Sequence, residues 1–134
     1  MWQIEFSTDK FLPYLPEDSQ GNPGVYGFEL ALWLSQGLMK RNIATAYPLG
    51  EDWGWFIEYL RDELELMICC SSQAEDGEGY KGTPIQWSIF IRAPGGLFKK
   101  TKGPQHDKAI ALLADNICAM LQQEGITFER AGAQ

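Results

Sequence analysis

The stretch GEDWGWFIEY, residues 50–59, carries the strongest fold signal in this sequence. Trp53, Trp55, Ile57 and Tyr59 recur at every second position, so an extended chain would place them on one side. Aromatic side chains bury large apolar areas, and we therefore expect that side to face the core. Gly54 lies between the two tryptophans, where it allows a bulge or a close approach of another backbone. The stretch thus predicts a core strand that begins at a tight corner.

Two carboxylates, Glu51 and Asp52, stand at the entrance to this predicted strand. A pair of carboxylates can perform acid–base chemistry or bind a cation, but both groups must then face one shared site. Adjacent residues in a loop can point in different directions. A structural role at the rim of the sheet, such as a turn hydrogen bond made by Asp52, is the favoured interpretation.

The rest of the chain alternates in a way that predicts further strands and two amphipathic helices. The predicted strands cover residues 2–6, 43–47, 53–60, 63–71, 85–93 and 126–128, and the predicted helices cover residues 25–41 and a segment between Pro104 and Gly125. The element order is β-α-β-β-β-β-α-β. We expect a hairpin of tight-turn length at Arg61-Asp62 and a C-terminal helix cap at Gly125.

This order predicts a single α+β domain over residues 1–134, built as a two-layer sandwich. Consecutive strands favour a mainly antiparallel sheet, and both helices, each apolar on one side, are expected to cover the same face. The reverse face should be solvated and mostly acidic. Its expected residues are Gln3, Glu5, Glu58, Glu63, Glu65, Gln86, Ser88 and Arg92.

The first helix contains an indole on its polar side. Leu30, Leu34 and Leu38 form the apolar side of this helix, whereas Trp33 falls among polar neighbours. Either the loop before the helix covers Trp33, or Trp33 is a contact point for a partner. Gly37 lies beside these leucines, where we expect another backbone to approach closely.

Composition excludes some classes of function. The net charge of −7 disfavours general nucleic-acid binding, because phosphate backbones would be repelled. The three cysteines are odd in number and have no CxxC spacing, which favours free thiols in a reducing cytoplasm. The opening residues MWQIEFSTDK resemble no signal peptide, and no apolar run is long enough to span a membrane.

Motifs for catalysis or cofactor binding are weak. The lysine-rich stretch GGLFKKTKG has Phe98 where a phosphate-binding loop needs glycine, and AEDGEGYKG lacks the ligand spacing of a calcium loop. His106 is the only histidine and has no sequence partner for a catalytic triad. We therefore expect no metal and no cofactor, and the sequence favours a non-catalytic protein over an enzyme.

The residues Gly27-Phe-Glu-Leu-Ala31 and Glu51-Asp-Trp-Gly-Trp55 resemble a pattern in small uncharacterised bacterial proteins, in which a GxELA helix precedes an EDWGW strand. The resemblance covers about Tyr26 to Cys70, roughly a third of the chain, and implies a bacterial cytoplasmic protein without established chemistry. In its general character, small, acidic and α+β, the chain also resembles immunity proteins of bacterial toxin systems.

We accordingly predict a non-catalytic module that binds a basic protein partner through an acidic surface. The predicted contact residues are Trp33, Glu51, Asp52, Glu58, Glu63 and Glu65. One alternative is an enzyme or small-ligand-binding protein with a cleft beside Glu51, Asp52 and His106. Another is a dimerisation module that exposes a strand edge or a helix face to a second copy.

Overall fold

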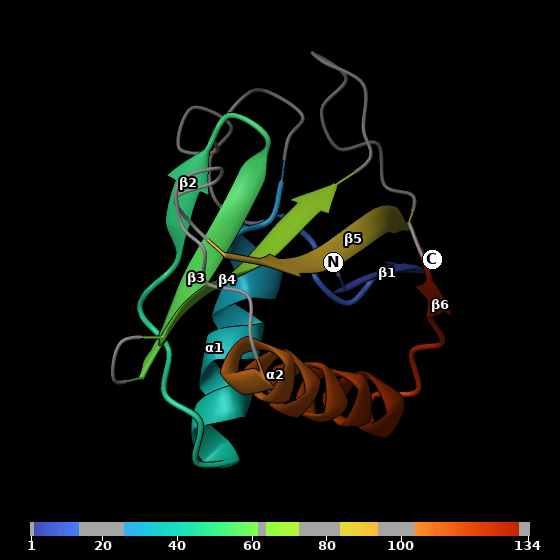
Figure 1. Ribbon diagram of the computed structural model, residues 1–134. Coiled ribbons are helices and arrows are strands. Elements are labelled where there is room, and N and C mark those ends of the chain that lie inside the picture. The colour runs from blue at the N-terminus through green and yellow to red at the C-terminus, as the bar shows by residue number, and fades with distance from the viewer. Residues whose placement is uncertain (1, 14–25, 62–63, 73–83, 94–103, 132–134) are drawn as a thin grey trace.

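The protein has the α+β architecture that the sequence predicts. The computed structural model describes residues 2–13, 26–61, 64–72, 84–93 and 104–131. Its elements are β1 (Trp2–Thr8), α1 (Phe28–Lys40), β2 (Leu49–Glu51), β3 (Gly54–Arg61), β4 (Leu64–Ser72), β5 (Ile85–Arg92), α2 (Pro104–Gln123) and β6 (Glu129–Arg130). Figure 1 shows both helices on the same side of the sheet.

The six strands form one open antiparallel sheet in the order β2-β3-β4-β5-β1-β6. The chain runs through β2 to β5 as consecutive hairpins, and β1 then pairs with β5 in the register Ile4↔Ile89. The first strand is therefore the fifth in the sheet, a long-range pairing that hydrophobic alternation alone could not reveal. The terminal elements of the sheet, β2 and β6, are only three and two residues long.

The core lies between the sheet and the helices. Every second residue of β5 points into it, and Trp87 and Ile89 are fully buried there. From the helices, Leu34 and Ile117 reach the same cluster with no exposed surface. The inward side chains of the strands and the apolar sides of the two helices thus pack in one layer, which confirms the predicted two-layer arrangement.

Several predicted boundaries shift. The expected strand at residues 43–47 is wrong, because these residues form no strand and β2 begins only after Pro48. A hydrogen bond from the Ala46 amide to the Glu58 carbonyl still holds this segment beside β3. Arg61 is the last residue of β3 and pairs with Leu64, so the prediction of Arg61 as a turn residue is wrong, and Asp62 lies outside the described residues. The last strand lies at Glu129–Arg130, after the predicted residues 126–128.

Two glycines that the sequence singled out, one within α1 and one after α2, have local explanations. Gly125 adopts a φ of 76°, and the Ile126 amide donates to the Leu121 carbonyl, which closes α2 as a glycine C-cap motif. Gly37 has a different neighbour from the one expected. A Cβ atom there would overlap the terminal methyl group of Met120, so α1 receives a flexible thioether of α2 and not another backbone.

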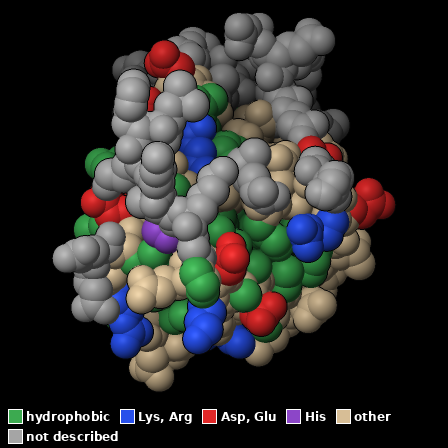
Figure 2. Space-filling view, in the orientation of Figure 1, with side chains coloured by type: hydrophobic (Ala, Val, Ile, Leu, Met, Phe, Trp, Pro, Cys, Tyr) green, Lys and Arg blue, Asp and Glu red, His purple; other side chains and the backbone are tan. Residues whose placement is uncertain are grey.

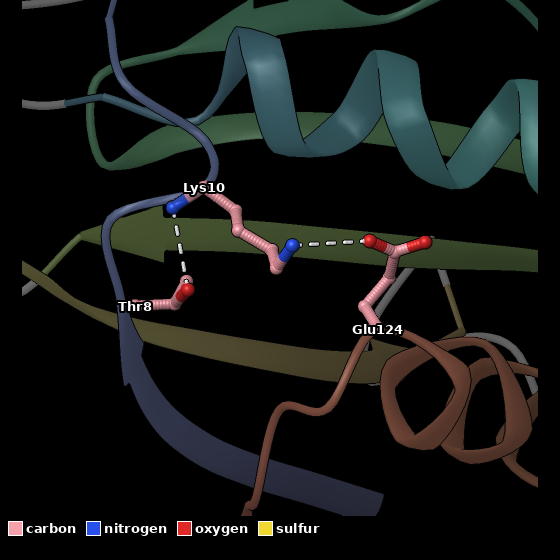
Figure 3. A network of polar contacts seen from close by, with 3 residues as sticks. All are labelled: Thr8, Lys10 and Glu124. Carbon is pink, nitrogen blue, oxygen red and sulfur yellow. Dashed lines mark hydrogen bonds and ion pairs between the residues drawn. The ribbon is translucent and has the colours of Figure 1, made fainter.

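A small polar network joins β1 to the end of α2 (Figure 3). The Lys10 ammonium lies 3.3 Å from Oε1 of Glu124, and the Lys10 amide donates to Oγ1 of Thr8 at 3.2 Å. Both charged side chains are more than two-fifths exposed. Water screens such a pair, so its contribution to stability is about 0–1 kcal/mol.

Candidate functional site

The hairpin between β2 and β3 turns Trp53 away from the core. Glu51 pairs with Gly54, which leaves Asp52 and Trp53 as the two turn residues. The indole of Trp53 lies 5.6 Å from the ring of Phe90, on the sheet face that the helices do not cover. We call this face, among the described residues, the outer face. The prediction that Trp53 shares the side of Trp55 is therefore wrong.

The tight corner at Gly54 explains this reversal. Gly54 has a φ of 155°, and a Cβ atom at this position would overlap the carbonyl oxygen of Cys70 on β4. The backbone of the turn thus lies directly against the neighbouring strand. Because the turn occupies Trp53, the alternation of β3 starts one residue later, with Trp55 inward and Phe56 outward.

An apolar row crosses the outer face. Leu49, Phe56, Cys69 and Phe90 stand opposite one another on β2, β3, β4 and β5, and we call them the apolar stripe. Phe56 and Cys69 are buried, at 8% and 0% exposure, yet both lie outside the main core cluster. The expectation of a solvated and mostly acidic reverse face is therefore wrong along this row. It carries a second, smaller apolar cluster.

Arg92 covers the aromatic rings at the solvent side of this cluster. Its guanidinium carbon lies 5.3 Å from the ring centroid of Trp53 and 5.8 Å from that of Phe90, within the range of cation–π attraction. Burial raises the pKa of the Cys69 thiol to about 12, against the opposing effect of the Arg92 charge and hydrogen bond. Cys69 is thus an uncharged packing residue at neutral pH rather than a reactive nucleophile.

The predicted acidic residues lie around this cluster. Glu58 and Glu65 are half-buried on β3 and β4, and their positions place both on the outer face. Glu51 is exposed on β2, and Asp52 is exposed in the turn beside Trp53. Glu63 lies outside the described residues. Glu51, Glu58 and Glu65 thus share the outer face, and Asp52 lies in the turn at its hairpin end.

Trp33 lies elsewhere. Its half-buried ring packs on the helix side of the sheet, with its centroid 4.9 Å from that of Phe11. Phe11 belongs to the segment between β1 and α1, so the covering alternative accounts for this indole. The structure does not bring Trp33 together with Glu58 or Glu65.

The two motifs that carry the bacterial resemblance meet in space. The Phe28 ring lies 5.2 Å from that of Trp55 in an edge-on arrangement, and a Cβ atom at Gly27 would lie 2.9 Å from the Cys70 carbonyl oxygen. The start of α1 therefore packs against the start of β3 and against the backbone of β4. These motif residues have a packing role that requires no catalytic function.

The alternative cleft beside Glu51, Asp52 and His106 has no counterpart in the cavity that the structure describes. That cavity, of about 510 Å³, is lined by none of these three residues. His106 is half-buried in the first turn of α2, where its Nε2 atom has no hydrogen-bond partner among the described residues. Within the described ranges, no cluster of three or more His, Cys, Asp or Glu side chains has the geometry to hold a metal ion.

Sequence reasoning missed the aromatic part of the site. The alternation of β5 already placed Phe90 and Arg92 on the reverse face, so Phe90 was a visible exception to its polarity. Phe56 was visible in the same way, as the outward neighbour of Trp55. The position of Trp53 could not be read from period two, because it depends on where the turn begins.

Comparison of the chain with protein-family models, with curated proteins and with solved structures gave no match. Neither helix is both long enough and apolar enough to cross a membrane, as far as the chain is described.

Proposed function

We propose that the protein is a non-catalytic module that binds a basic protein partner through its outer sheet face. The observation that carries this proposal is the cluster of Trp53, Phe90 and Arg92 on that face. Tryptophan and arginine are the residues that most often dominate binding energy at protein interfaces. Here an arginine stacks on two aromatic rings, which holds all three side chains in place before a partner arrives.

The apolar stripe gives this surface area and shape. Leu49 at one end is 48% exposed, and Leu60 on the same strand face as Phe56 is 58% exposed. Half-buried Phe90 continues the row toward β1. Exposed apolar side chains beside a fixed aromatic cluster are typical of the centre of an interface.

The charge of the face favours a basic partner. Five glutamates occupy outward positions on the described strands: Glu5, Glu51, Glu58, Glu65 and Glu129. On the same strands, Arg92 is the one arginine at an outward position. Glu5 stands directly opposite Glu129 across β1 and β6. Like charges in such a pair destabilise a sheet, and a cationic partner would relieve this repulsion.

Figure 2 shows one side of the molecule, in the orientation of Figure 1. Acidic side chains are spaced singly there, among hydrophobic, neutral and basic ones. The proposal rests on the glutamates at outward positions of the strands and not on the net charge of −7 alone.

The resemblance described above supports a bacterial, cytoplasmic setting and an immunity-type role, in which a basic toxin would be the partner. Homodimerisation through the outer face is disfavoured, since the glutamates of two copies would face each other. Pairing at the edge strands is disfavoured as well, because β2 and β6 offer only three and two residues for hydrogen bonding.

Charge reversal on the outer face tests this proposal. Immobilised protein is incubated with host lysate, and captured proteins are quantified by mass spectrometry for the wild type and for the double variant Glu58→Lys/Glu65→Lys. The proposal expects a basic protein that the wild type retains and the double variant loses, with retention that falls as salt rises. Equal capture by both proteins, or capture of nothing by the wild type, contradicts it.

A further inference from the structure

The cavity of about 510 Å³ lies at the other end of β3 from the Trp53 hairpin. Its wall combines the end of α1, the following residues, the last residues of β3 and the middle of α2. The lining residues are Arg41, Asn42, Ile43, Ala44, Tyr59, Leu60, Arg61, Leu112 and Asn116. Cavities of 300–1,000 Å³ are of the size that binds small molecules.

Two of the four arginines in the chain line this cavity. Arg41 comes from the end of α1, and Arg61 from the end of β3. The chain as a whole has a net charge of −7. Two guanidinium groups at one cavity therefore make this part of the molecule more positive than the rest.

The Arg41 guanidinium has a fixed orientation. Its Nε atom donates to Oδ1 of Asn116 at 2.6 Å, and Nδ2 of Asn116 in turn donates to the Leu112 carbonyl at 2.8 Å. The amide is therefore held at both of its ends. One of the five N–H donors of Arg41 is used in this contact, and the Nη groups provide four more for a planar anion.

Arg61 supplies the second charge. It is exposed at the end of β3, and among the described residues no carboxylate forms an ion pair with it. Guanidinium groups bind carboxylate and phosphate through paired hydrogen bonds. The cavity thus has one arginine held by its neighbours and a second that is available to an incoming anion.

Part of the wall is apolar. Ile43 and Tyr59 are buried, at 7% and 5% exposure, whereas Leu112 is 41% exposed on α2. An exposed leucine beside a cavity offers apolar area that a ligand can cover. A bare inorganic ion would leave this part of the wall unused.

The end of α1 opposes an anion only weakly. A helix C-terminus carries about half a negative charge, and here the Leu38 and Met39 carbonyls already accept hydrogen bonds from the amides of residues 41–43. Two full positive charges outweigh this partial one. The geometry points to a site for a small organic anion, in which a carboxylate or phosphate group meets Arg41 and Arg61 and an apolar body lies against Ile43 and Leu112.

Phenyl phosphate and benzoate are suitable probes, with inorganic phosphate and benzyl alcohol as the matched compounds that lack the apolar body or the charge. Titrations are followed by ¹H–¹⁵N spectra, which report the side-chain amide of Asn116 and the Nε–H groups of the arginines. Ligands of this size are expected to bind with a dissociation constant of about 1 mM. Whichever aromatic anion binds more tightly identifies the charged group.

The expected result is binding of at least one aromatic anion, with inorganic phosphate and benzyl alcohol about tenfold weaker and with Arg61→Ala weakening the aromatic anion about tenfold. Arg130→Ala, on the opposite edge of the sheet, is the control and should leave binding unchanged. No shift at Asn116 with any probe, or equal losses in both variants, overturns the inference. If inorganic phosphate binds as tightly as the aromatic anion, the proposed contact of an apolar ligand body with Ile43 and Leu112 is wrong. The outer face is untouched by Arg61→Ala, so the two proposals fail independently.

Discussion

The guanidinium of Arg92 lies 5.3 Å from the ring centroid of Trp53, although the two residues are 39 positions apart in the chain. Trp53 comes from the β2–β3 turn and Arg92 from the end of β5, two strands away in the sheet. Their contact forms over Phe90 on the outer face. This relationship adds a fixed aromatic and cationic cluster to the apolar stripe and makes the outer face a candidate recognition surface.

The outer cluster should contribute less to folding than the core does. Trp53→Ala removes a half-buried ring, and we expect it to lower the free energy of unfolding by about 1 kcal/mol. Trp87→Ala removes a fully buried ring and should cost about 3–5 kcal/mol. Urea unfolding of both variants measures the difference. Equal losses would mean that Trp53 is a structural residue, which would remove the main support for the proposed interface.

Gly54 should tolerate no side chain. In Gly54→Ala the new Cβ atom would overlap the Cys70 carbonyl oxygen, a backbone atom that cannot move without shifting β4. We expect a loss of about 3 kcal/mol or more in the free energy of unfolding. Gly125→Ala is the matched control: its site is open, and only its φ of 76° is unfavourable, at about 1 kcal/mol. Similar losses in the two variants would refute the proposed close contact between the turn and β4.

The raised pKa values of the buried thiols should lower the stability of the protein at alkaline pH. Burial raises the pKa of Cys69 from its ordinary 9.0 to about 12, and burial also raises the pKa of fully buried Cys70. Above pH 9 the unfolded chain releases these protons while the native protein keeps them. The free energy of unfolding should therefore fall as pH rises from 9 toward 12, by about 1.4 kcal/mol per unit for each thiol.

Cys69→Ala isolates this effect. Other groups also titrate at high pH, so the relevant quantity is the difference between the wild type and the variant under reducing conditions. The variant should have a lower stability at pH 7 and a shallower decline above pH 9. Parallel declines for the two proteins would show that Cys69 ionises as easily in the native state as in the unfolded chain.

The fold could be predicted from the sequence because its main signals are local. Alternation in residues 85–92 and the leucine spacing of α1 each identify an element and its buried side without knowledge of the rest. Strand order could not be predicted, because nothing local indicates that β1 pairs with β5. The expected strand at residues 43–47 failed for a related reason: its residues alternate, but β2, which pairs with β3, begins after Pro48.

The candidate site was predicted only in part. Glu58 and Glu65 were placed on the correct sheet face, since period two fixes the side on which a strand residue points. Trp53 was placed on the wrong face, because the two-residue turn at Asp52 and Trp53 interrupts that period. The arginine cavity was not predicted at all. Arg41 and Arg61 lie twenty positions apart in separate elements, and only the packing of α1, β3 and α2 brings them to one cavity.

The most direct test of the proposed interface is the affinity of the captured partner for Trp53→Ala and Met39→Ala, measured by isothermal titration calorimetry. Met39 is 56% exposed on α1, in the helix layer, and serves as the matched exposed apolar residue. We predict that Trp53→Ala weakens binding at least tenfold, or about 1.4 kcal/mol, whereas Met39→Ala leaves it unchanged. Wild-type affinity in Trp53→Ala, with both variants folded, would contradict the assignment of the outer face as the binding surface.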